Sequence, residues 1–258
     1  VGDTSGVAGS AGTIIAEGTS SNPIIFRPLS SGQQWGGIFV RYTQDVSNAV
    51  PPSPLPRLVN CVIEGASIGL NIYGRSLDFL TVANCTIRQC GTGIAIAQSS
   101  FPTIDGCRIE NCDLALRVAT DADYGRPLVR LPTIRNCTVT NNRLALSLGG
   151  NFPFPDLSRW DNANNSFTLI DGMDVGFAGS TSTFVPDYVW RDTIMGLPVV
   201  VRGGGNALRI FNRTVIPAGT TLRFMPSGVG QFQVTGPRSV LVAQGTAANP
   251  IRFTCTDP

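Results

Sequence analysis

Aliphatic side chains recur at fixed distances from four cysteines in the first half of the chain. The cysteines are Cys61, Cys85, Cys107 and Cys137, which stand 24, 22 and 30 residues apart. Around each of them an aliphatic residue lies three positions before it and two, nine and eleven positions after it. The position seven residues after the cysteine is also aliphatic, except for Thr92. Such a recurrence identifies an internal repeat.

The apolar positions alternate with polar or small ones, which is the period of a β-strand with one buried face. An amphipathic helix would need apolar residues at a spacing of three and four, and the repeats lack it. Because a single repeat cannot bury its apolar face alone, we expect successive strands to stack in parallel, about 4.8 Å apart. The pattern predicts an all-β, right-handed parallel β-helix with coils of about 22–30 residues.

Three longer segments interrupt the repeat and predict loops that bulge outward. They are residues 42–57, which are rich in Pro, 119–131 and 149–164.

A second repeat brackets the first. Residues 13–28 and 240–255 share Ala, Gly-Thr, Asn-Pro-Ile and Phe at an offset of 227 residues. We therefore predict a single β-helix domain over 1–258 that is part of a longer repeat array. Its predicted parts are two copies of one element (13–40 and 240–258), core coils (57–150), a long insertion (151–193) and further coils (194–258).

These repeats resemble the parallel β-helix repeat family, including β-helix regions of large bacterial surface and secreted proteins. The resemblance implies an extracellular or cell-surface location. It implies little about activity, because this architecture carries many functions.

Composition narrows the chemistry. The chain contains no His and no Lys, and its 19 basic residues are all Arg. Catalytic triads, His metal ligands and Schiff-base chemistry are therefore excluded. The net charge of +2 does not favour a nucleic-acid partner. No apolar run is long enough to predict a membrane-spanning helix.

Seven cysteines allow three interpretations: a metal site, disulfides that join successive coils, or interior columns of small apolar side chains. Cys85 and Cys90 have the same spacing as Cys107 and Cys112 in the next repeat. Free Cys is among the most buried residue types, which favours the interior columns.

Paired carboxylates would indicate a glycan-cleaving enzyme. The richest local set is Asp105, Glu110 and Asp113, but the neighbouring repeats place no acid beside Asp105 or Asp113. We predict that these acids are solvated on an outer face and that none is catalytic; Asp105, Glu110 and Asp113 are the candidates for catalysis if the protein is an enzyme. The hydrolase motifs of the family are missing, and its lyase motif is incomplete.

Two further sets have candidate binding chemistry. Asp121 and Asp123 in a Gly-containing loop offer oxygen ligands for calcium, but the remaining ligands of a calcium loop are missing, which favours a turn stabilised by Asp. Trp160, Tyr188 and Trp190 could stack on sugar rings or form a hydrophobic cluster under a long loop. No cofactor other than calcium is predicted.

The sequence as a whole favours a non-enzymatic, extracellular structural, adhesive or filament-forming module that associates end to end with itself. Two alternatives remain: a lyase or hydrolase acting on acidic polysaccharides, and a carbohydrate-binding module without turnover.

Overall fold

The structure of the chain is a computed structural model. The residues that it describes are 13–30, 32–41, 54–73, 79–97, 102–120, 132–151, 161–163, 165, 168–175, 188–194, 196–202, 208–210, 213–225, 232–235 and 239–255. Within these ranges every named element is a β-strand.

The chain forms two compact units. Unit 1 comprises Val1–Val118, Arg130–Ala145 and Leu157–Asn165. Unit 2 comprises Ala119–Val129, Leu146–Asp156 and Ser166–Pro258.

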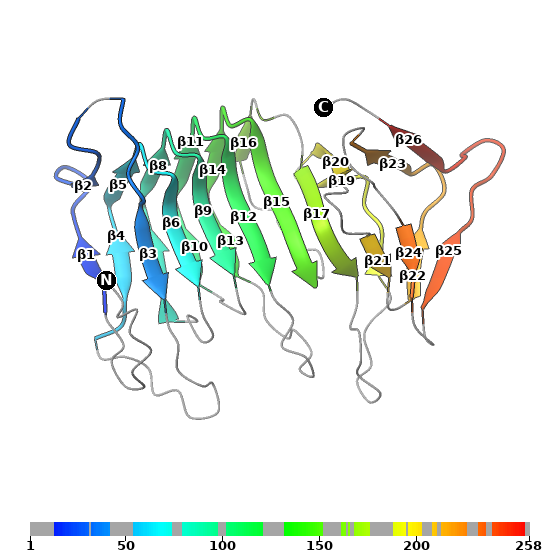
Figure 1. Ribbon diagram of the computed structural model, residues 1–258, viewed down its shortest axis with the longest axis horizontal. Helices are drawn as coiled ribbons and strands as arrows, with labels where there is room; N and C mark the ends of the chain where they lie inside the picture. Colours follow the sequence, from blue (N-terminus) through cyan, green and yellow to red (C-terminus); the bar gives the residue numbers. More distant parts are fainter. Residues whose placement is uncertain are drawn as a thin grey trace. The chain divides into compact units, whose positions relative to one another are not determined.

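Unit 1 is a stack of coils, of which the first four each contribute one strand to each of three sheets (Figure 1). The first sheet contains β1 (Ile15–Glu17), β4 (Arg57–Val59), β7 (Thr81–Ala83), β10 (Thr103–Asp105) and β13 (Thr133–Arg135). The second contains β2 (Ile24–Phe26), β5 (Cys61–Glu64), β8 (Thr86–Arg88), β11 (Arg108–Glu110), β14 (Thr138–Thr140) and β16 (Asp161–Ala163). The third contains β3 (Ile38–Arg41), β6 (Ile68–Tyr73), β9 (Thr92–Ala97) and β12 (Leu114–Thr120).

The predicted repeat positions lie directly above one another. In the first sheet Val82 pairs with Leu58 on one side and with Ile104 on the other. In the second sheet Ile87 stands in the same way between Ile63 and Ile109. All six side chains are fully buried, and each such burial contributes about 1.5–3 kcal/mol. The predicted parallel β-helix is thereby confirmed.

The residue before each repeat cysteine forms a sharp corner between two sheets. Asn60, Asn84 and Asn136 have φ values of 49°, 52° and 54°, and Gly106 has 63°. Left-handed backbone is unfavourable for most side chains but tolerated by Asn and Gly. A second corner follows five residues later at Gly65, Gln89, Asn111 and Asn141, all with positive φ. These residues explain why Asn recurs in the repeat.

Unit 2 is also built of stacked parallel strands. Its longest series consists of β15 (Leu144–Asn151, from Leu146 onward), β17 (Thr168–Val175), β20 (Leu197–Arg202), β23 (Thr221–Phe224) and β26 (Arg252–Cys255). Beside it β17 also pairs with β21 (Leu208–Ile210), which pairs with β24 (Phe232–Val234). A separate sheet contains β18 (Tyr188–Val189), β22 (Arg213–Ile216) and β25 (Val240–Ala243). The short β19 (Thr193–Ile194) pairs antiparallel with β20.

The segment 151–193, which we expected to be a long insertion, contains strands. β16 and β17 lie within it and pair in parallel with neighbouring coils. No Asn-Cys pair marks this segment, and Asp171 and Gly172 interrupt its apolar alternation, so the repeat is not visible there in the sequence. Most of the three predicted loops lies outside the described residues.

The two copies of the bracketing element have the same local structure. In the first, the amide of Asn22 donates to the hydroxyl of Thr19 at 3.0 Å, and the amide of Thr19 donates to the carbonyl of Asn22. In the second, Asn249 and Thr246 form the same two bonds, at 3.0 and 3.1 Å. The sequence echo therefore corresponds to a repeated turn.

Candidate functional site

The outer face of unit 1 carries the acids that the sequence singled out. Asp105 ends β10, and its carboxylate lies 2.8 Å from the guanidinium of Arg135 in the next coil. The side-chain amide of Asn136 donates to the same carboxylate at 2.8 Å. These bonds from Asn136 and Arg135 lower the pKa of Asp105. Asp105 thus serves as an ionised link between coils.

The other two acids do not join Asp105 in a cluster. Glu110 lies on β11, in a different sheet, and is paired with Arg108 of its own strand. Asp113 is exposed and lies immediately before β12, the third strand of the coil. Among the described residues there is no group of three or more His, Cys, Asp or Glu side chains that could hold a metal ion.

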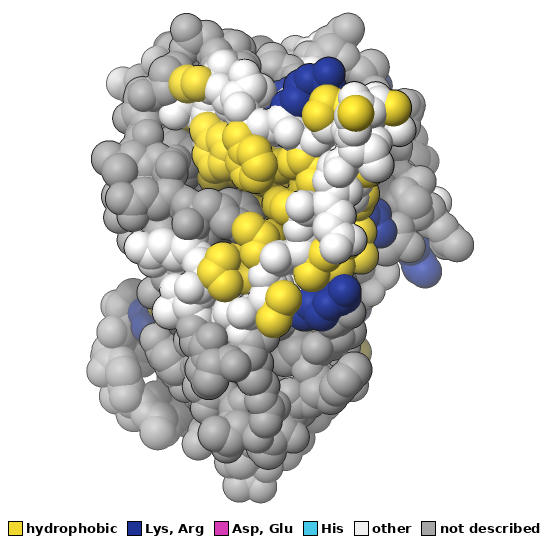
Figure 2. All heavy atoms as spheres, turned by 90° about the vertical axis from the view of Figure 1, so that its right-hand side faces the viewer, with side chains coloured by type: hydrophobic (Ala, Val, Ile, Leu, Met, Phe, Trp, Pro, Cys, Tyr) yellow, Lys and Arg dark blue, Asp and Glu magenta, His cyan; other side chains and the backbone are white. Residues whose placement is uncertain are grey.

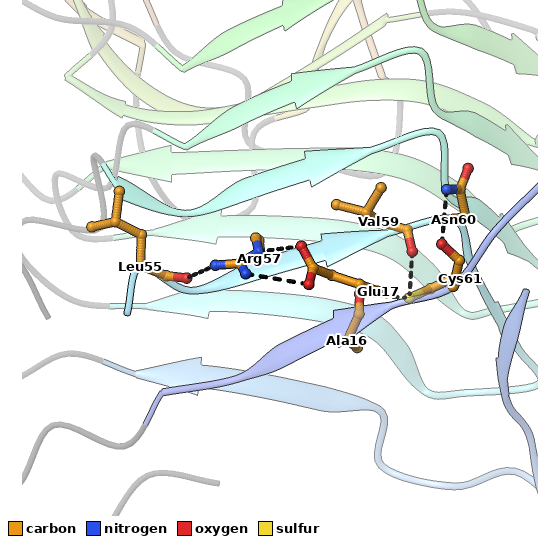
Figure 3. A network of polar contacts seen from close by, with 8 residues as sticks. Ala16, Glu17, Leu55, Arg57, Val59, Asn60 and Cys61 are labelled. Atoms are coloured by element: carbon orange, nitrogen blue, oxygen red, sulfur yellow. Dashed lines mark hydrogen bonds and ion pairs between the residues drawn. The ribbon is translucent and has the colours of Figure 1, made fainter. Parts of the chain in front are cut away.

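Ion pairs between neighbouring coils recur along the stack. Glu64 on β5 accepts two hydrogen bonds from Arg88, its partner on β8, at 2.6 and 2.9 Å. Glu17 on β1 is paired with Arg57 on β4 (Figure 3). Sequence reasoning searched for acids at matched positions and overlooked opposite charges there. The available signal was the position two residues before the repeat cysteine, which is Asp105 in one repeat and Arg135 in the next.

The cysteine columns are interior. Six cysteines are buried and reduced, and only Cys255 is exposed. The thiol of Cys61 donates to the carbonyl of Ala16 at 3.4 Å, and that of Cys85 donates to Leu58 at the same distance. Each thiol thus satisfies a carbonyl of the preceding coil. Burial, followed by the neighbouring Cys85, raises the pKa of Cys61 to about 11, which makes this thiol a poor nucleophile.

The second column changes chemistry along the stack. It begins with Cys90 and Cys112 and continues with Asn142, which is 2% exposed. The side chain of Asn142 accepts from the amide of Cys112 at 2.9 Å and donates to the carbonyl of Ile109 at 3.1 Å. Asn165 follows it and donates to Val139 at 2.6 Å. This column is a structural hydrogen-bond ladder.

One open hollow of about 730 Å³ lies beside the first coils of unit 1. Its lining residues come from three coils: Arg27, Pro28, Leu29, Ser30, Gly32, Gln33, Gln34, Glu64, Gly65 and Gln89. Gln34 donates to the carbonyl of Ala66, and Glu64 is held by Arg88. Leu29 is fully exposed. Sequence reasoning missed this hollow because the second corner of the coils was not recognised.

The remaining predicted binding residues do not form a described site. Trp190 is 2% exposed, so its ring belongs to the interior of unit 2. The backbone of Tyr188 pairs with Thr214 in the parallel sheet. Trp160 and the two calcium candidates, Asp121 and Asp123, lie outside the described residues.

Stacked parallel coils with an aliphatic and thiol interior define a β-helical solenoid protein. The chain belongs to the family described as the right-handed β-helix region, whose model matches residues 12–182, more than half of its length. Comparison with curated proteins and with solved structures found no match. In the described part of the chain, no helix has the length and apolar character needed to cross a membrane.

Proposed function

We propose that the protein is a non-enzymatic structural module of the cell surface or extracellular space, with an adhesive or filament-forming role. The observation that carries this proposal is the use of the outer-face carboxylates. Asp105, Glu64 and Glu17 each bind an Arg of a neighbouring coil. These carboxylates link neighbouring coils. Hydrogen bonds from their partners lower the pKa of Asp105 and of Glu17, so these two side chains favour the ionised form and are poorly suited to donate a proton.

The rival function is cleavage of acidic polysaccharides. Retaining and inverting glycosidases need two carboxyl groups that face one sugar, one of them protonated. The lowered pKa of Asp105 opposes that second requirement. Pectin, alginate and other acidic glycans should therefore remain uncleaved when they are incubated with the protein and assayed for new reducing ends and unsaturated sugars.

The Asp105→Asn variant and the matched Glu17→Gln variant separate the two functions. Both substitutions remove an ion pair between coils, but only the first removes one of the three candidate catalytic acids. Turnover by the wild-type protein that Asp105→Asn abolishes and Glu17→Gln retains would replace the structural proposal with an enzymatic one.

Glycan binding without turnover is a second candidate function, favoured by the hollow in unit 1. Its volume of about 730 Å³ lies in the range of ligand sites. Arg27, Ser30, Gln33 and Gln89 supply donors and acceptors along its wall. Binding on a glycan array that Gln89→Ala weakens, and that the exposed Asp113→Ala leaves unchanged, would support this role. An array without binders would remove it.

A further inference from the structure

The two copies of the bracketing element are stacked on opposite sides. In unit 1 the copy formed by β1 and β2 pairs with the coil that follows it, through β4 and β5. In unit 2 the copy formed by β25 and β26 pairs with the coil that precedes it, through β22 and β23. Within the described residues, neither copy pairs on its other side. Each copy is thus covered on one edge, and the covered edges of the two copies are opposite ones.

The backbone of the unit 1 copy presents alternate residues to the two edges. The amide of Ile24 donates to Asn60 of the following coil at 3.3 Å, so Ile24 and Phe26 face that coil. The carbonyl of Ile14 accepts from Arg57 at 2.9 Å. Because neighbouring residues of a strand point to opposite sides, Ile25 and Arg27 direct their amides and carbonyls to the free edge.

The unit 2 copy presents the complementary set. The amide of Arg252 donates to Thr220 of the preceding coil at 2.9 Å. The backbone groups of Phe253 and Cys255 consequently face the free edge. At the offset of 227 residues, Phe253 corresponds to Phe26, whose backbone faces away from the free edge of its own coil. In a parallel ladder each pair consists of one residue that faces its partner strand and one that faces away, so Phe253 and Phe26 can pair in register.

The free edge of the unit 2 copy is also apolar. Phe253 and Val240 are 56% and 47% exposed. Figure 2 shows hydrophobic and Arg side chains across the face that carries β25 and β26. Strand edges with exposed apolar side chains are templates for pairing with another chain.

We propose that this edge binds the first coil of a second copy of the chain. In the complex β25 lies against β1, and β26 lies against β2. The identical Thr-Asn turns allow the two coils to follow one path, as they do in stacked identical segments. Gln244 stands at the position of Glu17, so no two acids face each other there. This inference rests on the proposed structural role and names the surface through which copies assemble.

Sedimentation velocity across a range of concentrations tests the contact. The wild-type protein should form dimers and longer species as the concentration rises. Phe253→Asp places a charge in the contact and should raise the dissociation constant by at least about tenfold. Val189→Asp is the control. Val189 is similarly exposed, at 51%, but it lies on β18, at the edge of its sheet opposite to β25. An unchanged melting temperature by circular dichroism will show that both variants fold.

A thiol cross-link tests the register. In the proposed stack Cys255 of one copy faces Pro28 of the next, about 4.8 Å apart between Cα atoms, which suits a disulfide. With Cu(II)-phenanthroline as oxidant, Pro28→Cys should give covalent dimers and longer chains. Ser67→Cys, an exposed position one coil further into unit 1, should not. Monomers at all concentrations, or equal cross-linking of the two variants, would overturn the contact. The glycan assays above judge the structural role separately.

Discussion

At the scale of single residues, the coils depend on corners that only a few side chains tolerate. Asn111 has a φ of 55°, and its amide donates to Thr140 of the next coil. Asn111→Ala should lower the free energy of unfolding by about 1 kcal/mol, since Ala is strained in left-handed backbone. Asn111→Gly should change it by only a few tenths. Urea unfolding followed by circular dichroism measures both, and equal losses would show that the corner does not select the residue.

The thiols provide a second test at this scale. One cysteine per chain, Cys255, should react quickly with a thiol reagent under native conditions, because the other six are buried. All seven should react after denaturation. The colour released by Ellman's reagent gives the stoichiometry. More than one fast thiol in the folded protein would contradict the interior columns, and Cys255→Ser identifies the fast one.

At the scale of elements, ion pairs tie one coil to the next, and their contribution depends on pH. The pKa of Asp105 is lowered from an ordinary value of 3.8 by Asn136 and Arg135. A carboxyl group whose pKa is lowered by folding stabilises the folded state at pH values above its pKa in the unfolded chain. This stabilisation disappears as the pH falls through the pKa of the folded state. The melting temperature of the wild-type protein should therefore exceed that of Asp105→Asn at neutral pH. The difference should begin to shrink as the pH falls below about 4 and should vanish only below the lowered pKa of the folded state.

Asp113→Asn is the matched control for this pH dependence. Asp113 is exposed, and no ion pair of it is found in the described part of the chain. At each pH from neutral to acid, the Asp113→Asn variant should have almost the same melting temperature as the wild-type protein. If Asp113→Asn reproduced the effect of Asp105→Asn, net charge rather than the link to Arg135 would explain the result.

At the scale of the whole molecule, the sequence predicted the coils where the repeat is dense. Aliphatic positions around Cys61 to Cys137 identified the interior because every such side chain must stack on its equivalent. The charged partners escaped prediction, since Arg135 reaches Asp105 only after 30 residues of chain. The strands between 151 and 193 were not predicted for another reason: they form by pairing with neighbouring coils, and no local repeat in the sequence marks them.

A stack of coils also predicts how damage spreads through unit 1. Ile87 is fully buried between Ile63 and Ile109, and Ile87→Ala should cost about 2–4 kcal/mol. Because each coil contacts mainly its neighbours, hydrogen exchange should accelerate most in β5, β8 and β11 and less in β2 and β14. Thr86→Ala, on the adjacent and partly exposed position of the same strand, is the control. Equal acceleration in every strand of unit 1 would mean that the coils open together, and the additive solenoid description would then be wrong.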